Sequence, residues 1–193
     1  LMNIVNDEDY ELTKAADIIG HDTALVVSLL DMVNRIAINS KITSIRHAAA
    51  ILGQKELKKW INTVITKELC ADKPNEITRI SLLRAKFAES LAPAFELALH
   101  ASELFLMGLF SVLDIILDVP MEEALSKVNV SKNIRNAILN QKGAFAEVYE
   151  FMAAYENADW QEVCRWMVVK DIDVDTVYKA YTETMIWYRE MFF

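Results

Sequence analysis

The sequence predicts an all-α protein, a multi-helix bundle of about ten helices with no sheet. Two observations carry this prediction. Hydrophobic residues make up 53% of the chain, whereas four glycines and three prolines leave few turns for a sheet protein. Apolar residues also recur at every third or fourth position along most of the 193 residues, and alternation with a period of two is hard to find.

Local start and stop residues define the first helices. Gly20 is expected to end a helix in the left-handed conformation, Asp22 to cap the next one, and Gly53 to stop a third. The expected helices are 8–19, 23–38, 44–52 and 55–69. The turn at 71–75 separates two groups of helices but is too short for a flexible linker. We therefore expect 1–193 to form one helical domain.

The second group is organised around 103–118, a stretch that is apolar except for Glu103, Ser111, Asp114 and Asp118. At about 100° per residue these four side chains fall within about 80° of one another. A helix that is apolar on nearly every other side must be enclosed by other helices. We therefore expect one central helix with a narrow acidic stripe. The helices expected around it are 76–92, 120–127, 131–140, 144–156, 160–169 and one from 176 onward.

Charge and composition exclude several classes of protein. A net charge of −8 disfavours nucleic acid and anionic membranes as partners, since both need clustered Lys and Arg. The sequence contains no signal peptide and no apolar span of about twenty residues. Cys70 and Cys164 lack metal-ligand spacing and are expected to be reduced core thiols in a cytoplasmic protein. Because the chain opens on Leu1, we expect a fragment of a longer protein.

One charged residue falls on an apolar face. The helix at 76–92 carries an apolar arc of about 120°, and Arg84 lies inside it. A buried arginine needs a carboxylate, for which Glu103 and Asp114 are the nearest candidates by sequence order. Arg84 could form a structural ion pair, could pack its stem and reach water, or could line a ligand pocket. The residues expected at this polar centre are Arg84, Glu89, Glu103, Ser111 and Asp114.

Aromatic residues gather near the end of the chain. Core packing explains most of them, but Trp187, Tyr188, Phe192 and Phe193 are candidates for an exposed patch. Such a patch would favour binding of a protein partner or self-association.

Motifs for common catalytic chemistry are missing. No serine lies in a Gly-x-Ser-x-Gly setting, and four scattered glycines cannot form a phosphate-binding loop. His21-Asp22 matches the adjacent His-Asp pair of the metal-dependent HD superfamily. It stands between a helix-ending glycine and a helix start, however, where Asp22 is an ordinary cap.

Four segments resemble a known family. Residues 22–34 and 42–53 resemble the opening of the HDOD domain, a non-catalytic relative of the HD-GYP signalling domain. Residues 81–89 and 103–114 look like the HDOD region of two-domain proteins with an N-terminal EAL domain. The similarity covers roughly residues 10–160, in order and with matching spacing. It implies an HD-superfamily-like bundle in two lobes, a fused EAL-type domain, and a non-enzymatic bacterial role in cyclic-di-GMP signalling through protein–protein contact or dimerisation.

The resemblance also implies a lost metal site. In HD-GYP enzymes, the run that matches Gly108 to Phe110 is followed by the His-Asp metal pair, where this chain has Ser111 and Val112. Serine and valine cannot anchor a divalent metal for hydrolysis. No catalytic residue, metal or cofactor is therefore expected.

Two alternatives remain open from the sequence. An atypical metal-dependent phosphohydrolase would need ligands from His47, His100, Glu103, Asp114 and Asp118. A small-molecule sensor would instead bind its ligand in the inherited cleft near Arg84.

Overall fold

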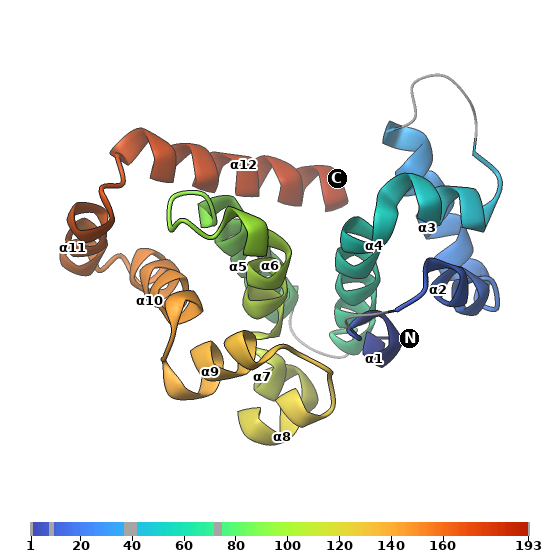
Figure 1. Cartoon of the computed structure of the whole chain (residues 1–193), viewed down its shortest axis with the longest axis horizontal. Helices are drawn as coiled ribbons and strands as arrows, with labels where there is room; N and C mark the ends of the chain where they lie inside the picture. The colour runs from blue at the N-terminus through green and yellow to red at the C-terminus, as the bar shows by residue number, and fades with distance from the viewer. Residues whose placement is uncertain (1, 8–9, 37–41, 72–74, 193) are drawn as a thin grey trace. The chain divides into compact units, whose positions relative to one another are not determined.

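The computed structural model describes residues 2–7, 10–36, 42–71 and 75–192, and every regular element in these ranges is a helix (Figure 1). In chain order the elements are α1 (Met2–Val5), α2 (Leu12–Ile19), α3 (Thr23–Ile36), α4 (Ile45–Leu69), α5 (Asn75–Leu91), the 3₁₀ turn η1 (Ala98–His100), α6 (Ala101–Phe110), α7 (Leu113–Leu117), α8 (Met121–Ser126), α9 (Lys132–Asn140), α10 (Ala144–Glu156), α11 (Trp160–Lys170) and α12 (Val174–Phe192). The predicted all-α class is confirmed.

The chain divides into two compact units, unit 1 (Leu1–Ile65) and unit 2 (Thr66–Phe193). Each has its own buried apolar residues, so each is described by itself. That 1–193 acts as a single domain stays a prediction.

Buried polar contacts tie α4 to the start of unit 1. The amide side chains of Asn6 and Asn62 each donate to the other's oxygen, at 3.1 and 3.0 Å. The Tyr10 hydroxyl donates to the Gln54 carbonyl, and the Gln54 side chain donates back to the Tyr10 carbonyl. Burial raises the pKa of Tyr10 to about 12, so this hydroxyl stays a donor at neutral pH.

The junction of α2 and α3 confirms one prediction and corrects another. The Asp22 carboxylate accepts from the backbone N–H groups of Ala24 (2.9 Å) and Leu25 (3.2 Å), so Asp22 caps α3 as predicted. Gly20, expected to be left-handed, is right-handed, with φ −59°. The N–H groups of His21 and Asp22 bond to carbonyls three residues back, which tightens the helix end into a right-handed turn.

Helix boundaries elsewhere in unit 1 follow the local signals. Gly53 interrupts α4 with φ 72°, which confirms the predicted stop. The predicted helix 8–19 begins later, at Leu12, and positions 8–9 lie outside the described residues. Positions 37–38, the predicted end of the second helix, also lie outside them.

Helices α5 and α6 approach closely at Gly108. A Cβ on Gly108 would lie 2.6 Å from the Ala85 Cα and closer still to the Arg84 carbonyl. Beside this contact, the buried Ser81 hydroxyl donates to the Leu109 carbonyl at 2.7 Å. Only glycine allows the two backbones to come so near, and the hydroxyl supplies a polar link between them.

The prediction of one continuous central helix over 103–118 is wrong. The segment forms two helices, α6 and α7, with a break at Ser111 and Val112, where Val112 has φ −124°. The Ser111 hydroxyl and N–H both donate to the Gly108 carbonyl, which a continuous helix would leave for Val112. The acidic stripe is therefore not continuous: Ser111 is buried, and Asp118 ends α7 with φ 59°.

The two cysteines differ in environment. Cys70 is buried, as predicted, whereas Cys164 is exposed on α11, which corrects its assignment to the core. Both are free thiols. No helix among the described residues is long and apolar enough to cross a membrane.

The aromatic end of the chain is partly packed. Trp187 is half-buried, with its ring 6.0 Å edge-on from that of Phe105, and Tyr188 is also half-buried. The side chains of Phe192 and Phe193 lie outside the described residues.

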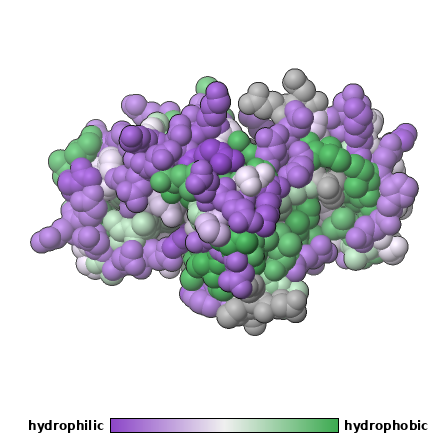
Figure 2. Space-filling model, turned by 90° about the horizontal axis from the view of Figure 1, so that it is seen from below, coloured by the Kyte–Doolittle hydropathy of each residue, from purple (hydrophilic) through white to green (hydrophobic). Residues whose placement is uncertain are grey.

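Hydrophobic residues reach the surface elsewhere in unit 2. The face in Figure 2 mixes hydrophilic residues with hydrophobic patches. Most exposed large apolar side chains of unit 2 belong to α11 and α12: Trp160, Val168, Val169, Val174, Tyr178, Tyr181, Met185 and Ile186.

We expect α12 to lose stability in acid through its N-terminal cap. The Thr176 N–H (2.7 Å) and then the Thr176 hydroxyl (2.8 Å) donate to Asp173 and hold the pKa of its carboxyl below its usual range. Because this pKa is lower in the folded than in the unfolded state, the ionised carboxylate contributes its full stabilisation to the folded state above about pH 4. That stabilisation is lost as the pH falls through the folded-state pKa. NMR titration of the carboxyl checks the shift. An Asp173→Asn variant should show a flatter acid dependence of unfolding, and a carboxyl titrating at or above 3.8 would contradict the cap.

Candidate functional site

Arg84 on α5 forms the centre of a polar contact among three helical segments. Its Nε donates to Glu156 Oε2 at 2.8 Å, and its Nη1 donates to Ser111 Oγ at 3.2 Å. The Arg84 side chain is 22% exposed and that of Glu156 36% exposed. The Ser111 hydroxyl donates onward to the Gly108 carbonyl at 2.7 Å. This arrangement gives a half-buried cation a carboxylate partner, which is the first of the three arrangements expected for Arg84.

The predicted partners of Arg84 are wrong. Neither Glu103 nor Asp114 bonds to it; Glu156, the last residue of α10, does. Glu103 instead contacts His100 at 2.8 Å, three residues earlier on the same segment. The helix break at Ser111 places Asp114 in the first turn of the separate helix α7.

The polar centre therefore assembles only in part. The structure brings Arg84 and Ser111 together and adds Glu156, which the sequence did not indicate. Glu89 pairs with Lys86 at 2.9 Å, one turn away on α5. No local pattern marks Glu156, because 72 residues separate it from Arg84 and only the packing of α10 on α5 joins them.

An aromatic cluster adjoins this polar contact. Tyr155, beside Glu156, lies 5.2 Å from the ring of Phe87 and 5.2 Å from that of Tyr181. Trp160 meets Tyr155 edge-on at 5.6 Å. Burial raises the pKa of Tyr155 above its ordinary value. The cluster joins α5, α10, α11 and α12 around the end of α10.

The contact is electrostatically unsuited to a divalent cation. A metal beside Ser111 would face the Arg84 guanidinium, which lies within hydrogen-bond distance of that hydroxyl. Across the described ranges, no three His, Cys, Asp or Glu side chains come together in a way that could hold a metal ion. None of the candidate ligands of the predicted alternative phosphohydrolase belongs to such a group in these ranges, and His100 packs against the ring of Phe145.

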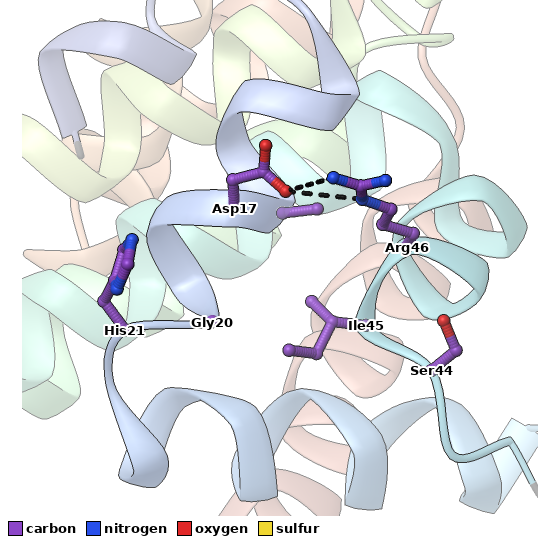
Figure 3. Close-up of a pocket in the computed structure, with 7 residues that line it drawn as sticks. Asp17, Gly20, His21, Ser44, Ile45 and Arg46 are labelled. Carbon is purple, nitrogen blue, oxygen red and sulfur yellow. Dashed lines mark hydrogen bonds and ion pairs between the residues drawn. The ribbon is translucent and has the colours of Figure 1, made fainter.

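An open hollow of about 550 Å³ lies in unit 1 (Figure 3). In the view, the Asp17 carboxylate meets the Arg46 guanidinium, and the Arg46 Nη2 donates at 2.8 Å. The lining is Ala16, Asp17, Gly20, His21, Ser44, Ile45 and Arg46. No residue of the predicted polar centre lines it, so this hollow is not the cleft predicted near Arg84.

Comparison with known proteins identifies the family of the chain. The fold is that of an HD-like helical bundle, and Ser111 and Val112 stand at the position where the resemblance to HD-GYP enzymes implies a lost His-Asp pair. The model of the HDOD domain matches residues 1–154, and the chain belongs to this family.

Two curated relatives match nearly the whole chain. One is named cyclic di-GMP phosphodiesterase CdgJ, from Vibrio cholerae serotype O1, and is 26% identical over 193 residues, covering 99% of this chain and 45% of that protein. The other is named uncharacterized protein YuxH, from Bacillus subtilis strain 168, and is 28% identical over 192 residues, covering 97% of this chain and 46% of that protein. The chain thus spans less than half the length of these relatives. No solved structure matches it significantly.

Arg84→Met should lower the free energy of unfolding by about 1–2 kcal/mol, because Glu156 and Ser111 then lose their donor. Urea denaturation of this variant, of Glu156→Gln and of the double variant measures the coupling between the two side chains. Arg79→Met is the matched control: it breaks an exposed ion pair with Glu76 on the same helix and should cost under about 0.5 kcal/mol. Equal losses for Arg84→Met and Arg79→Met would contradict the structural role of Arg84.

Proposed function

We propose that the chain is a non-enzymatic bacterial signal-transduction module, linked to cyclic-di-GMP signalling and acting through protein–protein contact or self-association. The Arg84–Ser111 contact carries the proposal. Where the HD-GYP resemblance implies a metal-binding pair, the chain has a serine bonded to a guanidinium.

The charge at this position supports the proposal physically. Hydrolysis of a phosphodiester by a metal-bound hydroxide needs a cation held by several protein ligands. Here the fixed cation is Arg84, which already has Glu156 as its counterion. A guanidinium so engaged stabilises packing between α5 and α10 and supplies no nucleophile.

The relatives support the signalling context. The name of CdgJ concerns cyclic-di-GMP, and this chain matches less than half of that protein. In the proposed scheme the remainder of the full-length protein is an EAL-type domain. This chain would relay the state of that domain in the bacterial cytoplasm. No cofactor is part of the scheme, and neither nucleic acid nor a membrane is a proposed partner.

Two measurements on the 193-residue chain test the proposal. The first incubates it with cyclic-di-GMP and Mg²⁺, Mn²⁺ or Zn²⁺, and we expect no hydrolysis above a protein-free control. Metal-dependent turnover above this control would overturn the proposal, and the metal ligands would then have to be sought among other residues. The second measures self-association and binding to an isolated EAL-type domain. We expect at least one of the two; the absence of both would remove the basis for an interaction module.

A further inference from the structure

The outer face of α12 carries apolar side chains at the spacing of a coiled-coil seam. The series, here called the outer seam, is Val174, Tyr178, Tyr181, Met185 and Tyr188. Its intervals of four, three, four and three residues put all five within about 80° on one side of the helix. Val174 and Tyr178 are each 69% exposed, and Met185 is 40% exposed.

The outer seam borders the side of α12 that faces its own core, and its Tyr181 also packs against the rings of Phe87 and Tyr155. Helix α12 packs on α5, and its buried residues are Val177, Ala180 and Thr184. These lie about a quarter of a turn around the helix from the outer seam. The buried stripe therefore serves the core of unit 2, while Val174, Tyr178 and Met185 of the outer seam stay exposed at a spacing that lets one helix receive another.

Opposite charges stand at the two ends of one edge of the outer seam. Asp175, Thr182 and Arg189 follow at intervals of seven, so they line the same edge. Both charged side chains are exposed, and neither has an ion-pair partner in the described part of the chain. The edge is thus acidic at its start, neutral in the middle and basic at its end.

We propose that the outer seam pairs with the outer seam of a second copy of this chain, with the two α12 helices antiparallel. In the register that sets Tyr181 of one copy against Met185 of the other, Tyr178 meets Tyr188. The same register brings Asp175 to Arg189 of the other copy at both ends, and Thr182 lies opposite its own equivalent. A parallel pair would place the Asp175 edge against Val177 and Thr184, and no opposite charges would meet.

This inference deepens the proposed function and rests on it, because it names self-association as the interaction. Helix α12 follows the residues 1–154 that match the family, so the pairing belongs to the C-terminal part of this chain. The outer seam is about 21 Å long, which makes a small interface. We expect a weak, reversible dimer with a Kd on the order of 10 µM.

Sedimentation velocity of the 193-residue chain, from about 1 to 200 µM, tests the pairing. We expect a monomer–dimer equilibrium that Met185→Glu weakens by about tenfold or more, because it places a carboxylate in the middle of the apolar contact. Ile186→Glu is the matched control. It makes the same kind of change one residue later, at a 44% exposed position outside the outer seam, and should change Kd by less than about threefold. Thermal unfolding of both variants shows whether each still folds.

Charge reversal tests the antiparallel register. Asp175→Arg alone and Arg189→Asp alone should each weaken the dimer, because like charges then meet at both ends. The double variant Asp175→Arg/Arg189→Asp should restore the dimer. Single variants that dimerise like the unchanged chain would overturn the register.

The failure of this inference can be told apart from the failure of the proposed function. A chain that is monomeric throughout, or a dimer that Met185→Glu leaves intact, overturns the pairing. Binding of an EAL-type domain would still support the proposed function in either case. Metal-dependent hydrolysis of cyclic-di-GMP overturns the proposed function whatever the oligomeric state.

Discussion

Gly108→Ala is expected to lower the free energy of unfolding of unit 2 by about 3 kcal/mol or more. The added methyl would lie 2.6 Å from the Ala85 Cα and still closer to the Arg84 carbonyl. Both obstacles are backbone atoms of α5, so no side-chain rotation can relieve the clash, and the two helices must separate. Separation would also strain the hydrogen bond from Ser81 to Leu109.

Gly20→Ala is the control for this prediction. Gly20 is right-handed, so alanine can adopt its backbone conformation, and the added Cβ would meet the Asp17 carbonyl at 3.2 Å. We expect a change within about 1 kcal/mol of zero. Urea denaturation followed by circular dichroism measures both variants. A cost at Gly108 no larger than that at Gly20 would contradict the close approach of α5 and α6.

Phe151→Ala should cost about 3–5 kcal/mol of unfolding free energy. Phe151 is fully buried on α10, with its ring 5.5 Å from that of Phe95 and 6.5 Å from that of Tyr155. Its loss leaves a cavity beneath α10, the helix whose last residue, Glu156, pairs with Arg84. We therefore expect the Arg84–Glu156 coupling energy to fall in this variant as well.

Leu99→Ala serves as the control for Phe151→Ala, because Leu99 is 90% exposed. Its substitution should change the unfolding free energy by no more than about 0.5 kcal/mol. Chemical denaturation measures this pair of variants, and a double-mutant cycle between Arg84 and Glu156 in the Phe151→Ala background measures the coupling. If that coupling were unchanged, the aromatic core would not be what positions α10.

Local sequence signals predicted much of the helical order. Helix α10 has the predicted bounds, 144–156, because Gly143 precedes it with φ 88° and apolar residues recur on one side. Asp22 caps α3 as expected, and Gly53 interrupts α4 as expected. These features depend on contacts within a few residues, which periodicity and cap preferences describe directly.

The central helix could not be predicted by the same means. Residues 103–118 are suited to one helix by their periodicity, yet the helix breaks at Ser111. The break depends on hydrogen bonds that compete with the helical ones. The Ser111 hydroxyl donates to the Gly108 carbonyl. The Ser81 hydroxyl donates to the carbonyl of Leu109, 28 residues further along the chain than Ser81.

By itself, the sequence determined the all-helical class, most helix bounds, the family and the presence of a cation that needed a partner. Only the tertiary structure decided that this partner is Glu156, that Ser111 joins the contact, and which side of α12 stays exposed. The physical reason is the separation along the sequence over which each interaction acts. Caps and periodicity act over one or two turns of helix, whereas the ion pair spans 72 residues and exists only because α10 packs against α5.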